Sequence, residues 1–412
     1  MSDGRPPTVP EIRKAIAAQA DGAGVRAYLV GGAVRDAIRR RRVRDLDVAI
    51  EGDAMAFARG WARAFRGRLT ASSEFGTAAV ELGTGTAAVR VDFAATRAET
   101  YSSPAALPRV RPAGIGEDLA RRDFTINAMA IPLNGPAAGK VLDPFGGRRD
   151  LSRGLIRMLH AGSPGDDPTR AFRAIRFARR FRFRIEPGTR RWIARAIAAG
   201  AFERLSGDRR RREVLRVLSE GEIRGAVRAM AALGLARTIA SGLGARPTTL
   251  RRLGRLESLA RRGRPSGWAA LLAWSLDIPV SGRREAARRL GLAGGAARDF
   301  ETIGLRVREA RAAEGSGKKK VSDLAAAVRG WPDDTVLAVA SALEPAAAAR
   351  LLRARALAAR VRLKISGDDL TRSGIAPGPA IGRALDQTWR ARIDRRIAAA
   401  QELPYALAEV RK

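Results

Sequence analysis

The hydrophobic pattern divides the chain into two parts. Between about residues 27 and 143, short apolar or alternating runs lie between stretches with helical spacing. The runs are AYLV, DLDVAI, GTAAVEL, AAVRVDFAA and NAMAIPL. After about residue 163 such runs disappear, and Ala, Leu and Arg dominate between Gly and Pro residues spaced like helix ends. The pattern predicts a mixed α/β region followed by an all-helical second half.

Three local signals refine the first part. Residues 12–20 are typical of a short helix ahead of the first strand. Asp53 is suited to cap an amphipathic helix, because apolar residues follow it at helical spacing. The sequence GTG at 83–85 separates two alternating runs and predicts the turn of a β-hairpin.

Length and charge change this picture. The chain has 412 residues, more than one hydrophobic core usually fills, so at least two domains are expected. Lys and Arg number 77 against 42 Asp and Glu, which gives a net charge of +35. A genome that favours Arg codons explains arginine over lysine, but it does not explain the excess of bases over acids. The charge therefore indicates a polyanionic partner.

Cysteine and histidine limit the chemistry that is open to the chain. There is no cysteine and one histidine, His160, which excludes disulfides, thiolate metal sites and a zinc centre with several histidines. Any metal ion must therefore be held by carboxylates. The sequence has no signal peptide and no long uncharged apolar segment, which predicts a cytoplasmic protein without a membrane partner.

Two acids lie within a strongly basic stretch, YLVGGAVRDAIRRRRVRDLDVAI at 28–50. On a strand, Asp45 and Asp47 point to the same face, about 6.6 to 6.8 Å apart along the strand. Such a pair can bind one or two divalent cations for phosphoryl transfer. Asp92 in VRVDF shows the same alternation and is a third candidate carboxylate. A solvated strand end is the alternative interpretation of an isolated acid pair.

The residues upstream favour the metal site. A strand that ends in Gly31-Gly32 and is followed by a helix with Arg35 can hold a triphosphate through backbone N–H groups and the helix N-terminus. The turn, the arginine and the acid pair follow in this order over 17 residues. This order is more specific than any of the three features alone.

Five segments complete the evidence from sequence motifs. They are LVGGAVRD with DLD, EDLARRDFTINAMA at 117–130, LDPFGGRRDL at 142–151, DDPTRAFRAIRFARRF at 166–181 and RLSGDRRRRE at 204–213. In this order they resemble the class II tRNA nucleotidyltransferases and related bacterial poly(A) polymerases, within the polymerase-β-like nucleotidyltransferases. The likeness is close over 27–215, and 365–385 is similar to the tail of some bacterial members.

The resemblance implies an α+β fold. A polymerase-β-like nucleotidyltransferase head with a small mixed sheet would be followed by an all-helical neck, body and tail. The expected parts are an N-terminal extension at 1–24, the catalytic head at 25–160, the neck with the nucleotide-selecting helix at 161–220, and a tRNA-binding body and tail at 221–412.

The resemblance also implies roles for individual residues. Asp45 and Asp47 would bind the catalytic Mg²⁺, and Asp92 occupies the place of an acid that either binds metal or supports the turn. The residues implied to contact the nucleotide are Gly31, Gly32, Arg35, Arg122, Asn127, Asp167, Arg170, Arg173 and Arg176. Arg122 would neutralise phosphate, and Asn127 would lie near the sugar or the phosphates.

The helix that begins near Asp167 would select the base. Three-residue steps place Asp167, Arg170 and Arg173 on one broad face of a helix. In the family, the acid and the first arginine contact the Watson–Crick edge, so that the protein itself is the template for C and then A. Arg173 and Arg176 would reach phosphates or hold that pair in place. Asp167 before Pro168 is also suited to cap the helix, and the two roles are compatible.

Two positions depart from the family pattern. Arg39 and Arg40 replace a Leu-Gly pair, and a left-handed cap without glycine would cost about 1 kcal/mol, so a different helix end is expected. Ala105 replaces a common glycine within 97–119. That segment is rich in proline, lacks a core-forming pattern and resembles the flexible loop of the family, which the alanine would stiffen.

The implied reaction is attack of an RNA 3′-hydroxyl on the α-phosphate of CTP or ATP, which adds CCA to tRNA and releases pyrophosphate. The helical half would bind the acceptor stem and T arm by shape and phosphate contacts. Alternatives within the class are addition of CC only or A only by one member of a split pair, and poly(A) synthesis. A non-catalytic RNA-binding protein on the same fold would be expected to lack Asp45, Asp47 or the arginines. The oligomeric state is left open.

Overall fold

The computed structural model describes residues 8–41, 43, 45–73, 76–83, 88–260, 263–314 and 320–411. The chain divides into two compact units, Met1–Leu205 and Ser206–Lys412. The boundary falls inside the predicted neck, so most of that segment belongs to the first unit together with the head. Arg42 and Arg44 of the basic stretch lie outside the described residues.

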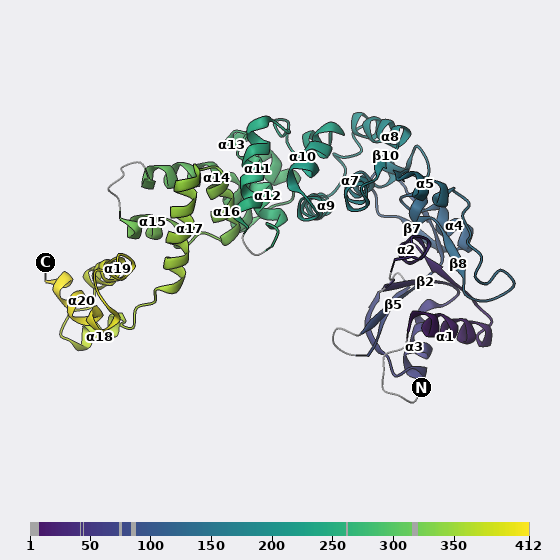
Figure 1. The fold of residues 1–412 in the computed structure, drawn as a ribbon, viewed down its shortest axis with the longest axis horizontal. Helices are drawn as coiled ribbons and strands as arrows, with labels where there is room; N and C mark the ends of the chain where they lie inside the picture. Colours follow the sequence, from purple (N-terminus) through teal and green to yellow (C-terminus); the bar gives the residue numbers. More distant parts are fainter. Residues whose placement is uncertain are drawn as a thin grey trace. The chain divides into compact units, whose positions relative to one another are not determined.

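A six-stranded mixed sheet forms the centre of the first unit (Figure 1). Its strands, in spatial order, are β3 (Arg68–Ser73), β4 (Thr77–Leu82), β5 (Val89–Ala95), β2 (Asp45–Glu51), β1 (Arg26–Val30) and β8 (Ala130–Pro132). Strands β2 and β5 are parallel, and the other neighbouring pairs are antiparallel. The predicted mixed sheet is therefore confirmed, as is the β4–β5 hairpin, although part of its turn lies outside the described residues.

Helices α1 (Val9–Gly22) and α3 (Ala54–Ala64) pack on one face of this sheet (Figure 1). Leu46, Val48 and Ile50 of β2 are at most 1% exposed and face these helices. The carboxylate of Asp53 accepts hydrogen bonds from the first turn of α3, which confirms the predicted cap. Because Leu46, Val48 and Ile50 point into the core, the alternating acids of β2 must point to the opposite face.

The segment predicted as a flexible loop contains regular structure, which corrects the sequence interpretation. Strands β6 (Arg97–Thr100) and β7 (Arg109–Pro112) form an antiparallel hairpin, and α4 (Ile115–Ala120) follows it. The hydrophobic pattern missed the hairpin because its strands are stabilised by ion pairs rather than by an apolar face. Ala105, in the loop between the strands, has φ +63°.

The end of α2 (Gly32–Ile38) corrects a second expectation. Arg40 adopts the left-handed conformation with φ +53°, although it lacks the freedom of glycine. The amide of Arg41 donates to the carbonyl of Asp36 at 2.9 Å, and the amide of Arg40 donates to that of Ala37 at 3.0 Å. The bond from Arg41 to Asp36 requires the left-handed conformation of Arg40, so the glycine-type helix end forms even without its usual residue.

The remaining elements of the first unit connect the sheet to the predicted neck. They are η2 (Thr125–Asn127), α5 (Gly147–Arg153), β9 (Leu155–Ile156), α6 (Ser163–Asp166), α7 (Thr169–Phe181), β10 (Arg184–Ile185) and α8 (Pro187–Ala198). Strand β10 pairs in parallel with β9. The neck was predicted to be entirely helical, and this short strand is an exception. Two residues per strand are too few for a detectable pattern.

The described residues of the second unit form α-helices and two 3-10 helices, η3 (Leu235–Thr238) and η4 (Ala399–Gln401) (Figure 1). Its α-helices are α9 (Gly207–Ser219), α10 (Ile223–Ala232), α11 (Pro247–Leu259), α12 (Gly267–Ser275), α13 (Val280–Arg289), α14 (Gly294–Glu314), α15 (Val321–Val328), α16 (Asp333–Ser341), α17 (Pro345–Arg360), α18 (Gly367–Arg372), α19 (Pro379–Ile393) and α20 (Glu402–Val410). The predicted helical body is confirmed. No described helix combines the length and the apolar character needed to cross a bilayer.

Candidate active site

The acid pair of β2 lies on the face of the sheet opposite α1 and α3. Parallel pairing places Asp47 directly beside Asp92 on β5, and Asp45 beside Arg90. Asp47 and Asp92 line a cavity of about 460 Å³ together with Arg90, Arg121 and Arg122. Two strands that are distant in sequence thus bring two predicted carboxylates together. Asp45 lies at the start of β2, where its side chain is exposed.

The electrostatics of the pair show repulsion between carboxylates. The side chain of Asp47 is accessible to solvent, but it lies in the cavity, where protein atoms surround it. Burial by the surrounding protein raises its pKa, the charges of Asp92 and Asp45 raise it further, and Arg122 and Arg35 oppose the shift. Arg90 donates to both carboxylate oxygens of Asp92 at 2.8 to 3.1 Å. A cation between these acids would relieve the repulsion.

This donor set suits a cation that binds together with its substrate. No three acidic or histidine side chains in the described part of the chain form a complete metal cluster. Mg²⁺-like ions commonly take one or two protein carboxylates and complete their shell with substrate phosphates and water. Asp45 and Asp47 on one strand face can supply those two carboxylates. Asp92 lies beside Asp47 in the sheet and is paired with Arg90.

The Gly31-Gly32 turn passes close to the acids. Gly31 has φ +63°, and a Cβ there would lie 3.0 Å from Arg122 Nη1 and 3.6 Å from Asp47 Oδ2. A Cβ at Gly32 would lie 3.8 Å from the same carboxylate oxygen. The absence of side chains keeps the backbone N–H groups at the start of α2 beside the cavity, where they can meet phosphate.

A chain of hydrogen bonds connects Arg35 to α7. The Nη1 of Arg35 donates to Asn127 Oδ1 at 2.8 Å, and Asn127 Nδ2 donates to Asp123 Oδ1 at 3.1 Å. Arg173 donates to Asp123 Oδ2 through Nη2 at 2.6 Å. Arg35 also pairs with Asp36 and lies over the ring of Phe181 at 4.5 Å. Three residues implied by the family resemblance, Arg35, Asn127 and Arg173, are thus joined in one network through Asp123, which the sequence interpretation did not include.

Arg121 and Arg122 are held by a carboxylate that the sequence interpretation missed. Asp118 is 1% exposed and accepts from Arg122 at 2.8 Å and from Arg121 at 2.7 Å. Burial alone would raise the pKa of Asp118, but the charges and hydrogen bonds of the two arginines lower it overall. The spacing of Asp118 to Arg121 and Arg122, three and four residues on a helical turn, was the signal that could have identified it.

Helix α7 begins one residue later than predicted, with Pro168 as its N-cap and without a side-chain cap hydrogen bond. Asp167 precedes this cap, and its Oδ1 accepts from the amide of Thr169 at 3.0 Å. Arg170, 5% exposed, donates to Ser163 Oγ and to the carbonyl of Arg121, both at 2.7 Å. Arg173 reaches Asp123, so both arginines contact the segment 121–123. Arg176 lies over the ring of Phe177 at 5.6 Å.

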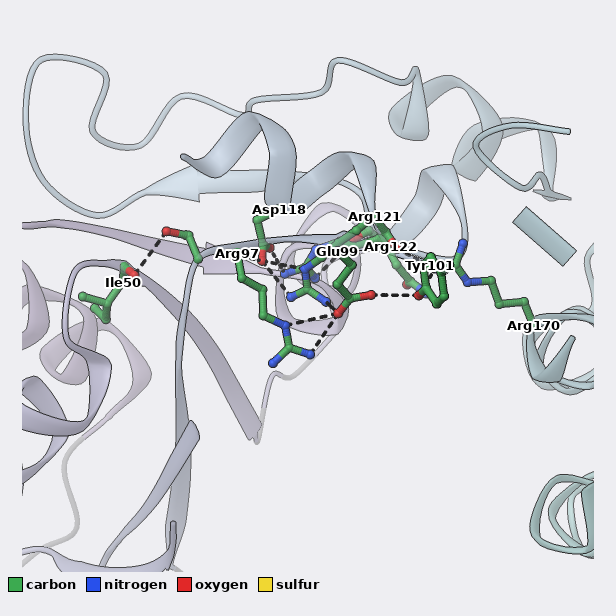
Figure 2. Close-up of polar contacts among 10 residues, drawn as sticks. Ile50, Arg97, Glu99, Tyr101, Asp118, Arg121, Arg122 and Arg170 are labelled. Carbon is green, nitrogen blue, oxygen red and sulfur yellow. Dashed lines mark hydrogen bonds and ion pairs between the residues drawn. The ribbon is translucent and has the colours of Figure 1, made fainter. Parts of the chain in front are cut away.

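The side chains of Glu99, Tyr101 and Arg170 form a contact between the β6–β7 hairpin and α7 (Figure 2). Glu99, whose side chain is 7% exposed, accepts from Arg97, Arg121 and the hydroxyl of Tyr101 at 2.9 to 3.0 Å. Arg170 Nη2 lies 3.5 Å from the same hydroxyl. Burial raises the pKa of Tyr101 to about 12. The alternation R-A-E-T-Y at 97–101 carried this signal, but only the pairing of the strands shows its partners.

Comparisons with known proteins agree with this geometry. Residues 27–157 match the family model described as the poly A polymerase head domain. An A-adding tRNA nucleotidyltransferase of Geobacter sulfurreducens is 33% identical over 381 residues, which cover 89% of this chain and 43% of the relative. A CCA-adding enzyme solved without ligand has a TM-score of 0.80 and 30% identity, with 96% of this chain and 95% of that chain covered. The Thermotoga maritima CCA-adding enzyme, solved with tRNA, has a TM-score of 0.75 and 29% identity, covering 97% and 94%.

The mixed sheet, the strand acids and the Gly-Gly turn define a polymerase-β-like nucleotidyltransferase head. Nucleotidyl transfer in such proteins generally uses a divalent metal ion. The chain belongs to the class II tRNA nucleotidyltransferase family, which includes the CCA-adding enzymes. It spans 43% of the length of the A-adding relative.

Proposed function

We propose that the protein adds CCA to the 3′ ends of tRNA from CTP and ATP and releases pyrophosphate. The observation that carries the proposal is the cavity in which Asp47 lies beside Asp92, next to Gly31 and Arg122. It combines paired carboxylates with phosphate-binding groups, and it contains neither cysteine nor histidine. The similarity to CCA-adding enzymes along almost the whole chain supports tRNA as the acceptor.

In the proposed reaction, the RNA 3′-oxygen forms a bond to the α-phosphorus while the bond from that phosphorus to the β-phosphate breaks. Pyrophosphate leaves, and the hydroxyl proton passes to solvent. Asp45 and Asp47 would hold Mg²⁺, which lowers the pKa of the hydroxyl and neutralises phosphate charge. Arg122, fixed by Asp118, would bind the triphosphate beside the Gly31 turn.

Base selection is assigned to α7. Asp167 and Arg170 would present hydrogen-bonding groups to the base, and Arg173 and Arg176 would hold them or reach phosphates. The contacts of Arg170 to Ser163 and to the carbonyl of Arg121 support a fixed position for its guanidinium group. A pre-positioned donor loses little entropy on binding, which favours discrimination between bases. The head and α7 lie in one compact unit, as this assignment requires.

The second unit would bind the acceptor stem and T arm of the tRNA, and the setting would be the cytoplasm, where tRNA and nucleotides are present. Its arginine-rich helices supply the positive charge that phosphate contacts need. Addition of A alone is a second candidate. It is favoured by the A-adding relative, which is 33% identical over 89% of this chain.

The test is incubation with tRNA transcripts that end at the discriminator base, after C, or after CC, each with labelled CTP or ATP. Incorporation of two C and one A is expected. Incorporation of A onto the CC end alone would replace the proposal by A addition. The double variant D45N/D47N should lose at least 1,000-fold in rate, in the range of losing one strong transition-state contact. The control D53N changes an acid that only caps α3, where Asn serves as well as Asp.

A further inference from the structure

A cavity in the second unit is lined by four arginines. It has a volume of about 400 Å³ and lies among α11, α13, α14 and the residue that follows α16. The described residues that line it are Arg252, Leu276, Ile278, Pro279, Val280, Arg283, Gly304, Val307, Arg308, Arg311 and Ala342. None of these is acidic, so the walls combine positive charge with apolar surface.

Two of the arginines are buried. Arg283 is 4% exposed and donates to the carbonyls of Ile278 at 2.6 Å and Glu301 at 2.9 Å. Arg252 is 9% exposed and pairs with Asp277. Burial lowers the pKa of Arg283, and the charge of Arg308 lowers it further. Buried guanidinium groups close to further cations are costly unless an anion offsets their charge.

The other two arginines lie on the exposed side of the cavity, one turn apart on α14. The side chain of Arg308 makes neither a hydrogen bond nor an ion pair among the residues that the structure describes. Arg311 Nη2 donates to the carbonyl of Ala342 at 3.2 Å. Four positive groups from three helices therefore face one cavity, and Asp277 is the carboxylate that pairs with one of them.

We propose that this cavity binds the phosphate of a nucleotide or of an RNA backbone. Guanidinium groups bind phosphate oxygens through charge-assisted hydrogen bonds. The cavity falls within the size range of small-molecule sites and is larger than a bare phosphate needs. Its apolar walls, including Pro279 and Val307, suit the ester part of the ligand. An RNA phosphodiester is one source, which rests on the proposed function, and a free nucleotide is the other.

The test compares R308A/R311A with R298A/R306A. Arg298 and Arg306 lie on the same helix but do not line the cavity, so both variants lose two charges from α14. Binding of a tRNA transcript is measured from 50 to 200 mM salt, and AMP binding is measured calorimetrically. We expect R308A/R311A to bind tRNA about tenfold more weakly than the control, with a salt slope smaller by about 1. Melting curves check that both variants are folded.

Each result either identifies which source of phosphate the cavity binds or shows that it binds none. Weaker tRNA binding in R308A/R311A alone assigns the cavity to an RNA phosphate. Loss of one AMP site with unchanged tRNA binding assigns it to a free nucleotide. Equal losses in both double variants, or unchanged binding in both arms, would overturn the proposal. These readouts do not depend on catalysis, so a wild-type protein without nucleotide incorporation would refute the proposed function and leave the phosphate test intact.

Discussion

Asp118 is the residue on which the arginines of the site depend. It is almost fully buried and is the shared partner of Arg121 and Arg122, one of which lies beside Gly31 at the cavity. A buried carboxylate is stable only when its charge is paired, and here two guanidinium groups provide the pairing. The position of Arg122 therefore depends on a buried carboxylate in the wall of the same cavity.

Asp118→Asn should lower the free energy of unfolding at pH 7 by about 2 kcal/mol, because two hydrogen-bonded charges lose their partner. The folded-state pKa of Asp118 lies below the unfolded value of about 3.9, so its contribution is present above that pH and is lost as the pH falls through the folded value. Urea unfolding from pH 7 to pH 2.5 measures this. The gap between wild type and variant should narrow below about pH 4.

The control for this series is Glu117→Gln, which removes the neighbouring acid. Glu117 is half exposed and pairs with Arg111 on the surface. Surface pairs contribute little, so its effect should stay below about 1 kcal/mol. A loss equal to that of Asp118→Asn would contradict the assigned role of the buried carboxylate.

Tyr101→Phe tests the link between the hairpin and α7. The hydroxyl donates to Glu99 and lies beside Arg170, so its removal should loosen the proposed base-selecting arginine. We expect kcat/KM for the correct nucleotide to fall about three- to tenfold, the effect of one ordinary hydrogen bond. Steady-state rates with CTP and ATP measure this, with Tyr405→Phe in the second unit as the control. Unchanged discrimination between nucleotides would contradict the positioning role.

At the scale of elements, the two positions that depart from family glycines keep the glycine conformation. Arg40 ends α2 and Ala105 lies in the loop of the β6–β7 hairpin, and both have positive φ. The amide of Ala105 donates to the carbonyl of Gly165 at 3.1 Å, which connects the loop to α6. At the end of α2, the bond from the Arg41 amide to the Asp36 carbonyl depends on the positive φ of Arg40 and offsets its steric cost.

Arg40→Gly should therefore raise the free energy of unfolding by about 0.5 to 1 kcal/mol, because the left-handed strain is relieved. Thermal or urea unfolding measures the change. Arg41→Gly is the matched control, since Arg41 is exposed and has no positive φ. It should be neutral or slightly destabilising, as glycine adds entropy to the unfolded chain. Destabilisation by Arg40→Gly would show that the arginine side chain contributes more than the strain costs.

At the scale of the whole molecule, the chain divides into two compact units, and each contains buried apolar residues. The first contains the mixed sheet, the acid pair and α7, and the second contains the arginine-lined cavity. The proposed chemistry and the proposed phosphate site thus belong to different units. We expect each unit to unfold as a unit of its own.

Calorimetric unfolding should therefore show two transitions. Asp118→Asn should shift the transition of the first unit by several degrees and leave the other in place. Tryptophan fluorescence follows both transitions, because Trp61 and Trp192 lie in the first unit and Trp268, Trp274, Trp331 and Trp389 in the second. The transition that Asp118→Asn shifts is then assigned to the first unit. A single transition that shifts as one would show that the units unfold cooperatively.

The sequence by itself determined the strands of the sheet, the helical second half and the acid pair. These features follow from local periodicity. The alternation of β2 places Leu46, Val48 and Ile50 in the core and the aspartates on the other face. The Asp53 cap depends only on neighbouring residues in the sequence. Motif order supplied the remaining site residues, whose roles stay predictions.

Only the tertiary structure decided which residues meet. The pairing of Asp47 with Asp92 and the approach of Tyr101 to Arg170 join segments up to 69 residues apart. Likewise, Arg252, Arg283 and Arg308 come from three helices, and nothing local marks them among the many arginines of the chain. Local periodicity fixes the direction of a side chain on its own element, whereas its partner depends on how distant elements pack.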